Sequence, residues 1–201
     1  MKQVSSLLML CACSLLTATA YGQQVDAAFG FNGVHATSAA NASSNYSPQS
    51  IGGGLTPSVS ADVLLWRNFG ASTEFSWRGG RALYQPDLYG STLPFRPIFY
   101  DFNGIWAPPI AKNITAELMA GIGLENTRFY VAQSCGVGCQ NFATTNHFLG
   151  HFGGGIRYYV KGNLFVRPEA HVYLVHNNQE FSSPYATRYG VSVGYTFGSR
   201  K

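Results

Sequence analysis

The 201-residue sequence predicts an all-β protein: an eight-stranded, antiparallel, up-and-down transmembrane β-barrel with a polar interior. Three observations lead to this prediction. Apolar and polar residues alternate with a period of two along most of the chain, as they do in β-strands. Only 11% of the residues are charged, less than half of the ~25% that is usual in soluble domains. Short and long connections alternate between the expected strands, which is the plan of an outer-membrane barrel.

Residues 1–22 are expected to be a signal peptide, because Lys2 precedes an apolar stretch that ends in small residues. Residues 23–201 would then form one barrel domain after export. No later segment approaches the ~20 consecutive apolar residues that a membrane helix needs. The 13 Lys and Arg are spread singly along the chain, so the sequence gives no indication of nucleic-acid binding.

Eight segments carry the alternation, and the last is the clearest, with apolar residues at odd positions from Thr187 to Phe197 and small or polar residues between them. Successive side chains of a strand point to opposite faces. One face of all eight segments is free of charge, whereas the other holds seven of the nine acidic residues. The apolar face therefore needs one continuous apolar partner. The segments are residues 25–32, 59–66, 71–78, 98–106, 114–125, 147–159, 164–174 and 187–197.

The connections are short after alternate strands, at 67–70, 108–113 and 161–163, and long and polar at 35–50, 79–94, 130–146 and 176–184. Tight turns would therefore lie at one rim and loops at the other. Four aromatic residues fall next to the short turns or the C-terminus, where a membrane-interface girdle belongs: Trp66, Trp106, Tyr158 and Phe197.

A secreted, lipocalin-like barrel would show the same period, with its apolar residues inside and its charges in water. Composition favours the membrane protein. After the signal peptide the chain has three lysines, Lys112, Lys161 and Lys201, and no segment carries the dense charge of a soluble exterior. A barrel also closes every backbone hydrogen bond between strands, as the bilayer requires.

The chain from residue 23 onward resembles the small OmpA-like or OmpX-like outer-membrane β-barrel proteins. The resemblance lies in the eight segments, the loop asymmetry and the C-terminal segment, where Arg188, Gly190, Val193 and Tyr195 are similar to the signal by which such proteins are recognised for assembly. It implies a bacterial outer-membrane location, outer-membrane lipids as partners, and recognition of the last strand by the barrel-assembly machinery.

Eight strands leave an interior that side chains can fill, so we expect no open pore. The charged faces would form a buried network in which each charge neutralises another, because an unpaired interior charge is costly. A gated proton or ion path is the alternative. The network is expected to contain Glu74, Asp101, Glu117, Glu125, His151, Arg157, Arg167, Glu169, His171 and Arg188. We expect Asp26, Asp62 and Arg78 to lie on the same interior face and to join it.

His147, His151 and His171 share the interior face, and a metal site there is conceivable, but no ligand motif is present and none is predicted. No cofactor is expected either. His176, Glu180 and Ser182 invite comparison with lipid A deacylase barrels. They lack the tight local motif of those enzymes and a base placed beside a nucleophile. A lipid-modifying enzyme therefore stays an alternative, and the sequence predicts no catalytic residues.

The long loops are rich in Asn, Ser, Gly, Pro and Tyr, and residues 41–48 and 81–95 are the best candidates for contact with a surface ligand. Cys135 and Cys139 are expected to form a local disulfide after export to an oxidising compartment. The function that the sequence favours is a structural or adhesion-like role exerted through these loops.

Overall fold

The structure, a computed structural model, describes residues 24–36, 50–84, 92–130, 141–178, 181 and 184–198. Within these residues the regular structure consists of strands, and none of the residues belongs to a helix long and apolar enough to span a membrane. The strands are β1 (Gln24–His35), β2 (Leu55–Trp66), β3 (Phe69–Trp77), β4 (Ala82–Tyr84), β5 (Leu93–Trp106), β6 (Pro109–Ala111), β7 (Ile114–Tyr130), β8 (Phe142–Lys161), β9 (Leu164–Val175) and β10 (Tyr185–Phe197).

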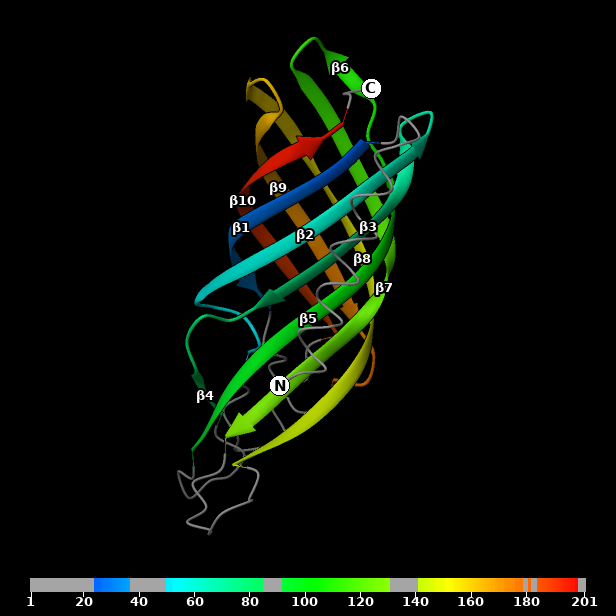
Figure 1. Cartoon of the computed structure of the whole chain (residues 1–201). Coiled ribbons are helices and arrows are strands. Elements are labelled where there is room, and N and C mark those ends of the chain that lie inside the picture. Colours follow the sequence, from blue (N-terminus) through cyan, green and yellow to red (C-terminus); the bar gives the residue numbers. More distant parts are fainter. Residues whose placement is uncertain are drawn as a thin grey trace, which may run out of the picture.

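Eight long strands close into an antiparallel barrel, as Figure 1 shows. Each pairs with its neighbours in the chain, β5 pairs with β7, and β1 pairs with β10 over eleven residue pairs to complete the ring. Each predicted strand lies within one of these eight. The one exception is Arg78, the last residue of the predicted segment 71–78, which lies just beyond the end of β3. The two short strands are additions at the rims, because β4 pairs only with β5 and β6 only with β7. The predicted fold class is confirmed.

The turn end of the barrel is built from tight connections. Arg67 and Asn68 both have positive φ, 47° and 67°, as a two-residue type I′ hairpin turn requires. A register shift between Leu64 and Trp66 precedes the turn. Strict alternation from Leu64, which points inward and is buried, would place Trp66 inside as well. The bulge turns Trp66 outward, where it is 65% exposed.

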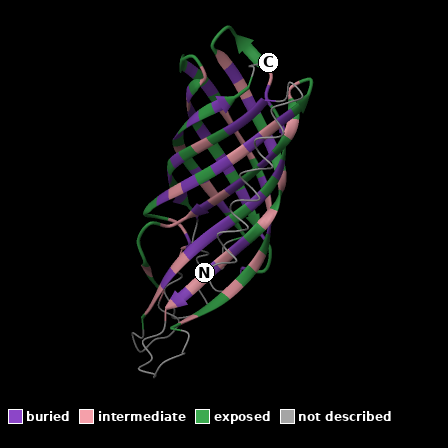
Figure 2. Ribbon diagram, viewed as in Figure 1, coloured by how far each residue is buried: buried purple, intermediate pink, exposed green. Residues whose placement is uncertain are grey.

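The barrel is inside-out over most of its height. Figure 2 shows buried and exposed residues alternating along the strands. The large apolar residues on the outside are exposed, with Phe102 at 69% and Ile122 at 58%, whereas Arg157 and Arg188 inside are at 0%. The chain thus places apolar surface where acyl chains lie and charge where water is excluded, as predicted for a polar interior.

The strands β5, β7 and β8 run beyond the predicted segments at the loop end. There the outward side chains become polar and the inward ones apolar. On β7, Leu124 points outward and Glu125 inward, but beyond them the outward residues are Asn126 and Arg128, and Phe129 is buried inside. The sequence prediction stopped at Glu125 because it followed an apolar outer face. We call residues 93–97, 126–130 and 142–146 the outer extension of β5, β7 and β8.

Several expectations fall on residues outside those described. They are the signal peptide at 1–22, the Cys135–Cys139 disulfide, the whole of the candidate contact loop at 41–48, and residues 85–91 of the candidate loop at 81–95. Glu180 and Ser182 of the alternative enzyme site also lie outside the described ranges, while His176 is exposed at the end of β9.

Candidate functional site

The structure buries all ten residues of the expected interior network, at between 0% and 6% exposure. They come from six strands and meet through cross-strand registers that sequence spacing does not reveal. Asp26 and Asp62 join them inside the barrel. Arg78 does not. It lies one residue beyond β3, where its Nη1 donates to the carbonyl of Gly52 at 3.0 Å, and its guanidinium lies over the ring of Phe95.

The layer nearest the turn end is centred on two arginines. Arg157 bonds to three carboxylates: Asp26, Asp62 at 2.6 Å, and Glu117. Arg167 contacts Glu117 at 2.8 Å and Glu169 at 2.7 Å, and its Nη2 donates to Ser60 at 3.0 Å. Each guanidinium therefore has several acceptors in a space closed to water, the condition under which buried charge is tolerated. We call this set the lower layer.

The middle layer joins one arginine to a histidine pair. Arg188 bonds to Glu74 and lies 3.8 Å from Glu169. The rings of His151 and His171 stack, and His151 Nε2 lies 2.9 Å from His171 Nδ1.

The chain of contacts continues from the histidine pair through Asn103, whose Oδ1 lies 2.6 Å from His151 Nδ1 and whose Nδ2 donates to Asp101 at 2.5 Å. The sequence analysis did not single out Asn103. The signal that could have identified it is its position between Asp101 and Ile105 on the inward face of β5.

Above the middle layer a few buried polar residues precede an apolar mouth. Glu125 accepts a hydrogen bond from Thr127, and His147 lies half-buried opposite Glu125 in the register of β7 and β8. Tyr173 stacks on Phe99 with ring centroids 5.0 Å apart. The mouth is then filled by an aromatic plug, which we define as Tyr84, Phe95, Phe99, Phe129, Tyr173 and Phe181.

The described surface of the barrel carries cations only. All seven described carboxylates are in the interior, whereas seven Lys and Arg side chains lie at the two rims. Arg67, Lys112 and Lys161 are at the turn end, and Arg78, Arg81, Arg96 and Arg128 at the loop end. We call the second group the arginine face.

Arg96 and Arg128 are directly opposite each other in the register of β5 and β7. None of the four arginines of this face makes an ion pair with a described carboxylate. Instead they contact aromatic rings or carbonyls. Arg81 lies over Tyr130 at 3.7 Å, Arg128 over Phe142 at 4.8 Å, and Arg96 donates to the carbonyl of Gly79.

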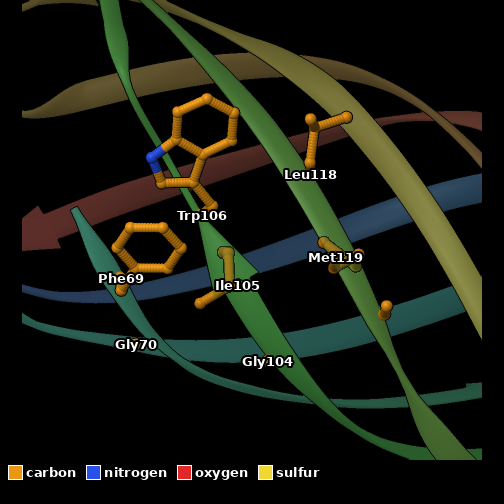
Figure 3. Close-up of a pocket in the computed structure, with 8 residues that line it drawn as sticks. Phe69, Gly70, Gly104, Ile105, Trp106, Leu118 and Met119 are labelled. Atoms are coloured by element: carbon orange, nitrogen blue, oxygen red, sulfur yellow. The ribbon is translucent and has the colours of Figure 1, made fainter.

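The expected interface aromatics all lie outward near the turn end. Trp66, Trp106, Tyr158 and Phe197 are between 41% and 65% exposed. Trp106 stacks with Phe69 at 5.8 Å between ring centroids. Figure 3 shows this pair beside a shallow groove of about 350 Å³, which opens because Gly70, Gly104 and Ala120 have little or no side chain. Leu118 borders it on β7, and the indole N–H of Trp106 is the one polar side-chain group in its lining.

The sequence matches no known protein-family model, and no curated protein matches it. Solved structures do match. The Neisserial surface protein A has a TM-score of 0.58 and 11% identity, over 88% of this chain and 97% of that one. Ail, the attachment invasion locus protein of Yersinia pestis, was solved with the heparin analogue sucrose octasulfate and has a TM-score of 0.55 and 10% identity, over 87% of this chain and 99% of Ail.

A major outer-membrane protein of Thermus thermophilus matches as closely, with a TM-score of 0.57 and 10% identity, over 86% of this chain and 99% of that one. At such identities the likeness concerns the fold. In all three comparisons it covers nearly the whole of the other protein, so the barrel is matched as a complete unit. The closed ring of eight antiparallel strands, the charged interior and these matches together give this chain the fold of the small eight-stranded outer-membrane barrels.

Proposed function

We propose that this outer-membrane barrel is a surface-interaction protein of the adhesion type, and that its loop end binds anionic glycans. The observation that carries the proposal is the arginine face, in which four arginines have no described carboxylate as partner. Arg96 and Arg128 face each other across β5 and β7, an arrangement of like charges that costs stability unless an anion lies between them.

The chemistry of these side chains fits sulfate or phosphate groups. A guanidinium offers a planar fork of donors that matches such oxyanions. Ail, which has the same fold, was solved with a sulfated heparin analogue. The arginine face lies beyond the apolar band, so its donors would be in water, where a polysaccharide can reach them. Export through residues 1–22, a Cys135–Cys139 disulfide in the β7–β8 loop and recognition of β10 by the assembly machinery complete the proposal.

The proposed role is non-enzymatic and involves no open pore. The aromatic plug fills the loop end, and the two charged layers fill the middle and the turn end. Phe95, Phe129 and Phe181 pack with ring centroids 4.9 to 6.4 Å apart, so among the described residues an apolar cluster occupies the interior at this end, which supports a closed barrel. Recordings from planar bilayers should therefore give no unitary current steps, and regular steps would favour the channel instead.

The test of glycan binding uses fluorescently labelled heparin as the polyanion and the barrel in zwitterionic detergent, where both ends are accessible. The Arg96→Gln/Arg128→Gln variant should lose about 1.5 kcal/mol or more, which is about tenfold in affinity. Binding to the unaltered protein should also fall as NaCl rises, because salt screens exposed charges.

The matched control is Lys112→Gln/Lys161→Gln, which removes the same number of charges at the turn end. It should bind heparin like the unaltered protein. An equal loss in both double variants would mean that heparin senses only net charge, and the proposed loop-end site would then be wrong.

A further inference from the structure

The middle layer of the barrel holds more negative than positive charge. In the described interior there are seven carboxylates and three guanidiniums. The middle layer contains Glu74 and Asp101 around the guanidinium of Arg188, and it shares Glu169 with Arg167 of the lower layer. Buried groups that are ionised need a compensating charge, which is either a proton or a bound cation. A divalent cation would cancel two of the four excess negative charges of the described interior.

The hydrogen bonds around the histidine pair determine where its protons lie. Asn103 donates through Nδ2 to Asp101, so its Oδ1 is the acceptor that faces His151 Nδ1 at 2.6 Å. The proton of neutral His151 is therefore on Nδ1, and its Nε2 accepts. His171 Nδ1, at 2.9 Å, must be the donor. This leaves His171 Nε2 with a lone pair.

That lone pair faces another acceptor. His171 Nε2 and Glu169 Oε1 are 3.8 Å apart, and neither atom has a hydrogen-bond partner although both side chains are about 99% buried. Glu169 Oε2 is already bonded to Arg167, and Arg188 Nη2 lies 3.8 Å from Oε1. A carboxylate oxygen of Glu74 completes a triangle whose members lie within 4.8 Å of one another. Three acceptor atoms that converge in this way, two of them buried and without a hydrogen-bond partner, form a geometry that a bound cation would satisfy.

We propose that Glu74, Glu169 and His171 bind a divalent transition-metal ion, with Zn²⁺ as the best match. One imidazole nitrogen and two carboxylate oxygens suit Zn²⁺, which takes such ligands at about 2.0–2.2 Å, with water in a fourth position. Tetrahedral ligands at those lengths are about 3.3 Å apart, so the three atoms must close by up to about 1.5 Å. Side-chain rotations of two glutamates supply such a shift.

The surroundings of His171 support the site. A metal-binding histidine ordinarily donates its second ring N–H to an acceptor that fixes its orientation, and His151 Nε2 is that acceptor here. The pair can approach because residue 153 is a glycine: a Cβ there would lie 2.5 Å from His171 Nδ1 and 3.1 Å from His151 Nε2. Glu74 comes from β3 and the other two ligands from β9, with β8 behind them. Because these strands are far apart in the sequence, no local motif contains all three ligands.

The test uses the full chain, freed of metal with EDTA while unfolded and refolded in detergent with Zn²⁺ as the only added metal. Zinc must be present during refolding, since the plug and both layers close the interior afterwards. After gel filtration, elemental analysis should find one zinc ion per barrel. X-ray absorption should show an imidazole nitrogen together with oxygen neighbours at about 2.0–2.2 Å.

Glu169→Gln and His171→Gln should each abolish zinc retention, while His147→Gln, the matched interior histidine outside the triangle, should keep it. Heat-modifiable gel migration identifies the variants that fold, and either ligand variant suffices for the comparison. Zinc-free unaltered protein would overturn the proposal and would make a protonated His171, visible in its ¹⁵N chemical shifts, the balancing charge. Zinc that survives in the folded ligand variant would overturn it equally.

Discussion

The strands have two regions, an apolar band in which the outward side chains are apolar and the inward ones polar, and the outer extension, in which this arrangement is reversed. On β7, Ile122 and Leu124 face outward in the band while Glu117 and Glu125 are buried inside. A few residues further along, Asn126 and Arg128 face outward and Phe129 is buried. One continuous strand thus changes from an inside-out to a water-soluble pattern without a break in pairing. Backbone hydrogen bonding is indifferent to the surrounding medium, so only the side chains need to follow it.

This comparison locates the upper edge of the apolar band. The outward residues become polar at nearly the same level on three adjacent strands: at Asn126 of β7 and its register partner Asn146 of β8, and at Arg96 of β5, two residues beyond the register partner of Asn126. Asn126 donates to Asn146 at 2.7 Å on the outer surface. Below this level the described charged groups of the strands point into the barrel. Above it, as with Arg96 and Arg128, they point outward.

The largest expected effect is the loss of a buried charge from the band. Arg157→Met leaves Asp26, Asp62 and Glu117 without their shared guanidinium, and we expect it to cost about 4 kcal/mol, the scale of a broken buried ion pair. Urea unfolding in lipid vesicles, with tryptophan fluorescence as the signal, measures this. The control Arg128→Met, in the outer extension, should change stability by less than about 0.5 kcal/mol. Similar losses would abolish the distinction between the regions.

The next effect is a cavity in the outer extension. Phe95 is 1% exposed and contacts Phe129 and Phe181 in the plug. Phe95→Ala should therefore cost about 3 kcal/mol, as in a soluble core. The same unfolding measurement applies, with exposed Phe102→Ala on the outer face of β5 as control. A larger loss at Phe102 would show that burial inside the plug contributes little.

The cost in stability of a charge placed on the outer face should depend on whether it lies inside or outside the apolar band. Ile122→Arg puts a guanidinium among acyl chains and should cost about 2 kcal/mol, which is within the range for lipid-facing arginine. Asn126→Arg, four residues along the same strand and on the same face, should be nearly neutral. Folding yields and unfolding free energies in vesicles compare the two. Equal costs would place the edge of the band elsewhere.

The smallest effect concerns the like charges of the arginine face. Arg96→Gln removes the repulsion from Arg128 across β5 and β7 and should stabilise the barrel by up to about 0.5 kcal/mol. The gain should shrink at high NaCl, because salt screens exposed charges. Thermal unfolding at low and high salt tests it, and a salt-independent change would point to packing against Gly79 instead.

The barrel was predictable because lipid imposes a simple rule on side chains. Within the apolar band the described charges avoid the outer face, so period-two alternation in segments such as 187–197 reveals both the strands and their faces. The same rule failed where the medium changes. The segments of β5, β7 and β8 were predicted too short, and Arg78 was placed in the interior, because above the band the apolar residues move inside.

The sequence could predict which residues lie in the interior site, but not how they are arranged there. Glu74, Glu169 and His171 could be assigned to the interior from their parity alone. Their meeting within 4.8 Å depends on which strands are neighbours and on their stagger. The role of Gly153 depends on the same geometry. A glycine in the run Gly153-Gly154-Gly155 gives no sequence signal that a histidine pair needs its space.

The sequence by itself determined that this chain forms a barrel, which face meets the membrane and which residues are enclosed, because the solvent on each side acts on every residue separately. Only the tertiary structure decided which enclosed charges become partners, where the plug closes the mouth and which buried acceptors converge. These features depend on distances of a few ångströms between strands, and the closure of the ring sets those distances.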